Sequence, residues 1–217
     1  DSIWCWGNNH YGNLGNLGNG QSALTTSSVK SPVPVQVQPT NGAPTSISAF
    51  YLHICAQLDN GGIDCWGYDS LGQLGDGGGN NHRSTPTSIA INQGMQVLSV
   101  AGGADHTCAV LTDGTVQCWG DNAQSQRGEA GPQITTPGPS SEVNLLLNGR
   151  KMVEIDGQGH HTCGVVDDGN VICWGQNHKA QSGAPITQTE TFAQEITFGF
   201  DPTQCTTDRL CLDWNLW

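Results

Sequence analysis

A four-fold repeat organises this chain of 217 residues. The tripeptide Cys-Trp-Gly occurs four times, with its tryptophans at Trp6, Trp66, Trp119 and Trp174. Each copy continues in the frame W-G-x-[ND]-x-x-x-[QN]-x-G. Repeats of about 50 residues are typical of arrays in which each unit buries its apolar face against its neighbours. We therefore expect a single domain of repeats, placed at about 1–45, 46–95, 96–150 and 151–200, with a C-terminal closing segment at 201–217.

A second element, His-x-Cys, precedes the last three copies and places one cysteine ten residues before the next. Between the two cysteines lies a three-residue segment that ends in glycine, which is typical of a β-hairpin loop. A hairpin around a loop at 112–114 places Cys108 opposite Cys118, and directly opposed residues have Cβ atoms about 5 Å apart. The register therefore predicts three cross-strand disulfides: Cys55–Cys65, Cys108–Cys118 and Cys163–Cys173.

A zinc site is the alternative for these cysteines. His106, Cys108 and Cys118 share one strand face, but they supply three ligands where a structural zinc site has four. We therefore expect disulfides and no metal site. Disulfides form in oxidising compartments, so the chain is expected to be secreted, extracellular or displayed at the cell surface. Its first residue is Asp1 rather than Met, as expected for a mature or trimmed chain.

Three of the nine cysteines remain, and all lie toward the ends of the chain. We expect Cys205 to pair with Cys211, which leaves Cys5 unpaired or in an intermolecular bond. A bond from Cys5 to Cys205 or Cys211, closing the repeats into a ring, is the alternative.

Short apolar segments between the glycine-rich stretches predict the secondary structure. One such segment precedes each His-x-Cys. Another follows each glycine-rich loop, and these segments are predicted strands at 34–37, 86–91, 143–147 and 192–198. Each period is thus expected to hold about four short strands and hardly any helix, because glycine and asparagine are poor helix formers. Four strands in about 50 residues are typical of one β-propeller blade. The predicted fold class is all-β.

The combined frame H-x-C-x-x-x-x-[DN]-G-x-x-x-C-W-G-x-N-x-x-G-Q-L-G resembles the repeats of RCC1-like (regulator of chromosome condensation) propellers. The resemblance covers nearly all of residues 1–200 and is closest to exported bacterial-type relatives with cysteines at both hairpin positions. It implies blades arranged around a central axis. Since this family usually closes with roughly seven blades, we expect either a compact four-bladed ring or an incomplete, open propeller.

The composition excludes several classes of function. A net charge of −12 excludes neutralisation of a nucleic-acid backbone, and no apolar run reaches the length of a membrane span. Because no catalytic or cofactor motif occurs, we expect neither an enzyme nor a bound cofactor. The leading prediction is a secreted or cell-surface protein-interaction module. Its candidate contact residues, in the loops after Cys-Trp-Gly, are Tyr11, Tyr68 and His178.

Two other functions stay open. One is a structural subunit of an extracellular assembly or filament, joined by strand donation. The other is a carbohydrate-binding propeller, suggested by the tryptophan and asparagine content. The repeated tryptophans are nevertheless expected to pack between neighbouring blades, and the motif G-W-R-H-T, which the resemblance associates with light receptors, is absent.

Overall fold

The computed structural model describes residues 2–16, 30–78, 81–91, 94–139, 141–183 and 190–196. In these ranges the chain forms one two-stranded and three four-stranded antiparallel sheets, which we call blades 1 to 4. Blade 1 holds β1 (Ile3–Asn8) and β2 (Lys30–Val37); blade 2 holds β3 (Pro44–Ala49), β4 (His53–Leu58), β5 (Ile63–Gly67) and β6 (Arg83–Ser88). Blade 3 holds β7 (Val97–Gly102), β8 (His106–Leu111), β9 (Val116–Gly120) and β10 (Ile134–Pro139); blade 4 holds β11 (Met152–Gln158), β12 (His161–Val166), β13 (Val171–Gln176) and β14 (Glu190–Ile196).

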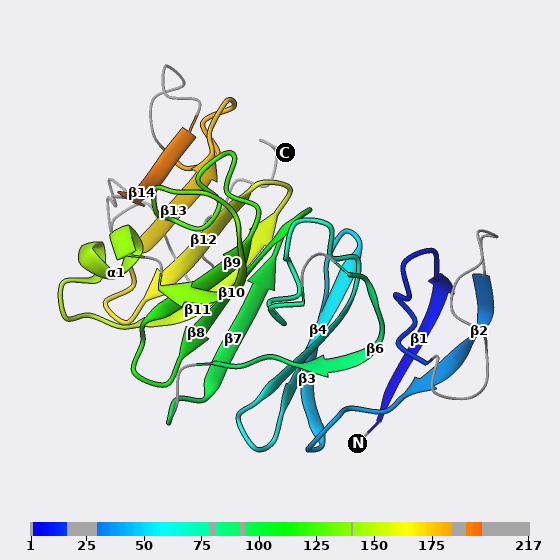
Figure 1. Ribbon diagram of the computed structural model, residues 1–217. Helices are drawn as coiled ribbons and strands as arrows, with labels where there is room; N and C mark the ends of the chain where they lie inside the picture. The colour runs from blue at the N-terminus through cyan, green and yellow to red at the C-terminus, as the bar shows by residue number, and fades with distance from the viewer. Residues whose placement is uncertain are drawn as a thin grey trace, which may run out of the picture.

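Figure 1 shows the blades side by side, with β1 and β2 at one end and blade 4 at the other. Within the described ranges the blades follow one another as an arc. Within them no helix is long and apolar enough to cross a membrane. The predicted closing segment at 201–217, with Cys205 and Cys211, lies outside the described residues.

The central hairpin of blades 2, 3 and 4 has the predicted register. Cys55 lies opposite Cys65, and the equivalent cysteines face each other in the next two blades. The loop glycine has a positive φ in each hairpin, near the +85° of Gly114. All three predicted disulfides are present, while Cys5 is a buried free thiol.

One predicted strand is wrong. The segment 143–147 forms the end of helix α1 (Ser141–Leu147), and the fourth strand of blade 3 is β10 instead. Helical spacing explains the difference, because Val143 and Leu147 are one turn apart and both buried, whereas Leu145 is 77% exposed. The helix packs its apolar side into the core between blades 3 and 4.

Three apolar clusters lie between successive blades. Between blades 1 and 2, Ile3, Cys5 and Val37 pack with Ala56 and Trp66. The two following interfaces are built in the same way, around Trp119 and Trp174 respectively. The tryptophans of blades 2, 3 and 4 are fully buried, which confirms the packing prediction for these three.

A repeated hydrogen bond accompanies this packing. The tryptophan Nε1–H of one blade donates to a backbone carbonyl in the loop after Cys-Trp-Gly of the preceding blade. The three pairs are Trp66 to Asn13 at 2.9 Å, Trp119 to Gln73 at 2.9 Å and Trp174 to Gln126 at 2.8 Å. Each blade therefore has two different sides, one that presents a tryptophan and one that accepts it.

Buried histidines add a second contact between blades. His53 Nε2 lies 2.8 Å from Thr107 Oγ1, and His106 Nε2 lies 2.8 Å from Thr162 Oγ1. Because the Thr107 hydroxyl donates to the carbonyl of Gln73, His53 must donate from Nε2, which leaves its Nδ1 unprotonated. That Nδ1 is buried without a hydrogen-bond partner, and burial lowers the pKa of His53 to about 3.

Candidate functional site

The loops after Cys-Trp-Gly share one conformation, set by the repeat frame. We call them loop 1 (9–15), loop 2 (69–75), loop 3 (122–128) and loop 4 (177–183). In each loop the [ND] side chain accepts a backbone N–H five residues later, as Asn9 does from Leu14. The [QN] side chain accepts a backbone N–H two residues earlier, as Gln73 does from Leu71. These two polar positions therefore build the loop rather than bind a ligand.

Loop 1 lies against the neighbouring blade at a close approach. A Cβ on Gly12 would lie 2.5 Å from the Cα of Ser84 in β6, and Gly12 has a φ of +80°. Only glycine fits there without a shift of the backbone. This contact brings the side chains at the tip of loop 1 next to the residues before β6 and after β5.

Four aromatic rings gather at this junction of blades 1 and 2, and we call them the aromatic cluster: His10, Tyr11, Tyr68 and His82. The Tyr11 ring centroid lies 4.5 Å from those of His10 and Tyr68 and 5.0 Å from that of His82. Tyr68 and His82 stack at 4.7 Å. Both histidines are exposed and both tyrosines are half-buried, so the cluster presents aromatic edges and faces to solvent.

Hydrogen bonding and burial hold His82 neutral. Its Nδ1 accepts the backbone N–H of Asp69 at 3.0 Å, which fixes the proton of the neutral ring on Nε2. Partial burial, and then the nearby His10, lower the pKa of His82 below its ordinary value. Asp69 itself is buried under the cluster, and burial raises its pKa to about 6. The His82 ring is therefore uncharged around neutral pH.

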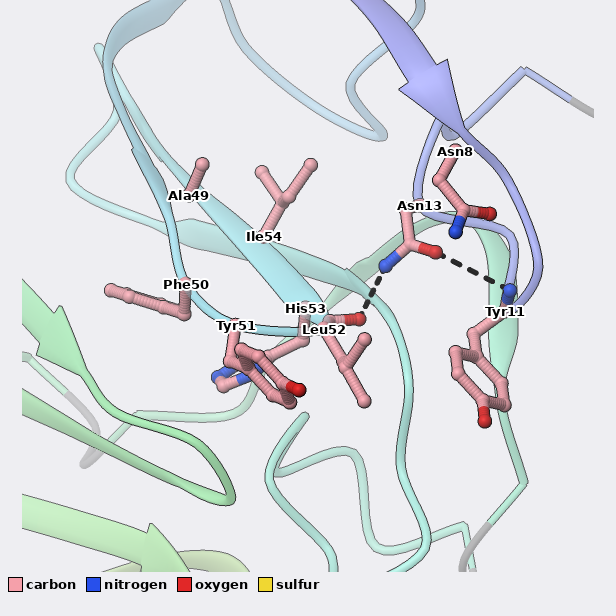
Figure 2. Close-up of a pocket in the computed structure, with 9 residues that line it drawn as sticks. All are labelled: Asn8, Tyr11, Asn13, Ala49, Phe50, Tyr51, Leu52, His53 and Ile54. Carbon is pink, nitrogen blue, oxygen red and sulfur yellow. Dashed lines mark hydrogen bonds between the residues drawn. The ribbon is translucent and has the colours of Figure 1, made fainter. Parts of the chain in front are cut away.

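A cleft of about 200 Å³ lies beside the cluster, between blade 1 and the turn from β3 to β4. Figure 2 shows Tyr11 at one side and Tyr51 at the other, with an Asn13 hydrogen bond to the carbonyl of Leu52 bridging the two blades. Its lining is mainly apolar and amide: Asn8, Tyr11, Asn13, Ala49, Phe50, Tyr51, Leu52, His53 and Ile54. Tyr11 belongs to both the cleft and the aromatic cluster, so the two form one continuous surface.

Two of the three predicted contact residues meet here. Tyr11 and Tyr68 come from different blades and touch, whereas the exposed His178 lies in loop 4 on blade 4. Sequence reasoning missed His10 and His82. His10 adjoins Tyr11 and could have been included, but His82 precedes β6 and only the packing of two blades brings it to the cluster.

The other residues with strongly shifted pKa values have structural roles. Asp69 accepts the Leu74 N–H within loop 2, and His53 and His106 join blades. The zinc alternative for His106 does not fit, because Cys108 and Cys118 are disulfide-bonded and the ring is directed to Thr162. Over the described ranges, no group of three or more His, Cys, Asp or Glu residues is placed to hold a metal ion.

Comparison with known proteins identifies the repeats. Models of the regulator of chromosome condensation (RCC1) repeat match residues 97–126 and 159–181, and, in a second version, residues 1–56 and 60–110. The ultraviolet-B receptor UVR8 of Arabidopsis thaliana is 32% identical over 153 residues, which are 69% of this chain and 33% of UVR8. The chain thus spans only about a third of this relative's length.

Solved structures share the arrangement of blades. Human WBSCR16 superposes with a TM-score of 0.76 at 22% identity, covering 94% of this chain and 50% of that protein. Yeast RCC1 (Prp20), crystallised with Kap60 bound to it, gives a TM-score of 0.73 at 19% identity and covers 92% and 46% respectively. Together with the repeat matches, these superpositions show that the arc is a stretch of β-propeller blades.

Proposed function

We propose that this chain, which belongs to the regulator of chromosome condensation (RCC1) repeat family, is a non-enzymatic module that binds a protein partner through its aromatic cluster. The observation that carries this proposal is the meeting of Tyr11, Tyr68 and His82 on two adjacent blades. Tyrosine is enriched among the residues that dominate protein interfaces, because it buries a large rigid area and keeps a polar tip. The apolar core between blades 1 and 2 also fixes the relative positions of the rings that the two blades contribute.

Charge indicates the chemistry of the partner. With 7 basic against 19 acidic residues, the chain attracts positively charged segments and repels acidic ones. Tyrosine rings attract lysine and arginine side chains through cation–π contacts, worth about 0.5–1 kcal/mol each at exposed sites. We therefore infer a protein segment rich in lysine and arginine as the partner. Yeast RCC1 provides a precedent for protein binding by this fold, since it was crystallised with Kap60.

The three disulfides support a proposal for the cellular location of the protein. Cross-links of this kind persist in oxidising compartments, so the proposal includes a secreted or cell-surface location. The test is to block free thiols in the native source before lysis and to compare the chain on reducing and non-reducing gels. A chain that is fully reduced in its source would refute this location.

Selection from a peptide library tests the binding proposal without a known partner. A random peptide library displayed on phage is panned on the 217-residue chain. We expect enrichment of peptides rich in lysine and arginine, with affinities that fall at least roughly tenfold on Tyr68→Ala. His178→Ala is the matched control, because it removes an exposed ring from loop 4, and it should leave binding unchanged. The absence of basic peptides, or equal binding to Tyr68→Ala, would refute the proposal.

A further inference from the structure

Among the described residues, no blade packs on one tryptophan of the repeat. Trp6 is 65% exposed, whereas the tryptophans of the other three Cys-Trp-Gly copies are fully buried. Trp4, two residues earlier on the same face of β1, is 49% exposed. The opposite face carries Ile3 and Cys5, which pack toward blade 2. Blade 1 therefore presents to solvent the side that, in blades 2 to 4, is covered by a preceding blade.

At the other end of the arc, loop 4 has the conformation of the three loops that accept a tryptophan. Ala180 has a φ of +61°, where Ser125 in loop 3 has +59°, and the left-handed region is uncommon for both residue types. The Gln181 side chain accepts the Lys179 N–H at 2.7 Å, as Gln126 does from Gln124. The carbonyl of Gln181 thus stands at the frame position at which the carbonyl of Gln126 accepts Trp174.

The glycine that ends each copy of the frame leaves room for the tryptophan ring. A Cβ on Gly75 would lie 2.6 Å from Nε1 of Trp119, so the tryptophan fills the space that a side chain would need. Gly183 occupies the same frame position in loop 4, with a φ of +75°, and among the described residues it faces Ile196 of its own blade. Loop 4 is therefore built like a tryptophan-accepting loop.

We propose that the Trp4 and Trp6 face of one copy docks on blade 4 of a second copy, with Trp6 Nε1–H donating to the carbonyl of Gln181. The same chain carries both halves of a contact that it already makes three times between its own blades. Because the two halves differ, the contact is head-to-tail.

Sedimentation of the 217-residue chain over a wide range of concentrations tests this contact. We expect the mass to rise above the 22.9 kDa monomer with concentration, and a non-reducing gel should show that the association is not covalent. Trp6→Ala should weaken it by roughly 30-fold or more, as at interface hot spots. Trp6→Phe, which keeps a ring but lacks the N–H, should weaken it by roughly 3- to 10-fold.

Leu98→Ala is the matched control. Leu98 is an apolar residue on β7 that is 51% exposed, and blade 3 has neighbours on both sides, so this variant should associate like the original chain. A chain that stays monomeric at every concentration would overturn the proposal. Equal association of the original chain and Trp6→Ala would also overturn it. A monomer in which Trp6 is shielded from a collisional quencher would assign the face to another segment of the same chain, against the proposal.

Discussion

Asp69→Asn should stabilise the protein at neutral pH. Loops 1, 3 and 4 carry asparagine at this frame position, so the amide fits the shared loop conformation. Asp69 is 1% exposed, and burial raises its pKa from 3.8 to about 6. At about 1.4 kcal/mol per pKa unit, holding the charged carboxylate in the folded state costs about 3 kcal/mol.

The stabilisation by Asp69→Asn must grow as the pH rises. The folded protein binds this proton more tightly than the unfolded chain does, so the cost is fully present above about pH 6. It declines as the pH falls through this value and disappears below the ordinary pKa of 3.8. Asp69→Asn should therefore exceed the original chain in stability by up to about 3 kcal/mol at neutral pH, with the gap closing in acid.

Urea unfolding of both proteins across this pH range measures the gap directly. Groups that titrate in both proteins, the buried histidines included, cancel in the difference. An Asp69→Asn variant that is less stable at neutral pH, or whose advantage is the same at every pH, would refute the assignment of a buried, protonatable carboxyl under the aromatic cluster.

Three further predictions concern the blades themselves. Replacing Cys108 and Cys118 by serine should lower the free energy of unfolding by about 3 kcal/mol, measured by urea unfolding, because a closed loop of this size restricts the unfolded chain. Leu147→Ala should destabilise the protein by about 2–5 kcal/mol, whereas Leu145→Ala should change it by less than about 0.5 kcal/mol, since only Leu147 is buried. His53→Gln should reduce the loss of stability in acid. Because the folded pKa of His53 is about 3, the stability that depends on a neutral His53 is fully present above pH 6.5, the ordinary pKa, and is lost as the pH falls from 6.5 toward 3. A difference curve from unfolding titrations would show no slope there if His53 were not buried neutral.

The hairpins could be predicted from the sequence because both constraints are local. A three-residue loop at 112–114 sets the register, and a ten-residue spacing centred on that loop places Cys108 opposite Cys118. The segment 143–147 lacked such a constraint. Five mainly apolar residues fit a strand or a helix equally well, and the true strand, Ile134–Pro139, is hidden by its two prolines.

The candidate site depends on contacts between blades, which spacing does not reveal. Tyr11 and Tyr68 occupy different positions of the frame, the fifth and the second after their tryptophans, and they meet only because loop 1 packs on the next blade. Trp6 and Trp119 occur in the same tripeptide, Cys-Trp-Gly, and are followed by the same frame. The exposure of Trp6 follows from its place in the arc, because no blade precedes blade 1 among the described residues.

A double-mutant cycle tests the central claim, binding of a basic segment by the aromatic cluster, most directly. The calorimetric affinity of a selected peptide is measured for the original chain and for Tyr68→Ala, with each lysine or arginine of the peptide replaced in turn by methionine. We predict that one basic residue couples to Tyr68 by about 0.5–1 kcal/mol. Purely additive effects at every basic residue would contradict the claim.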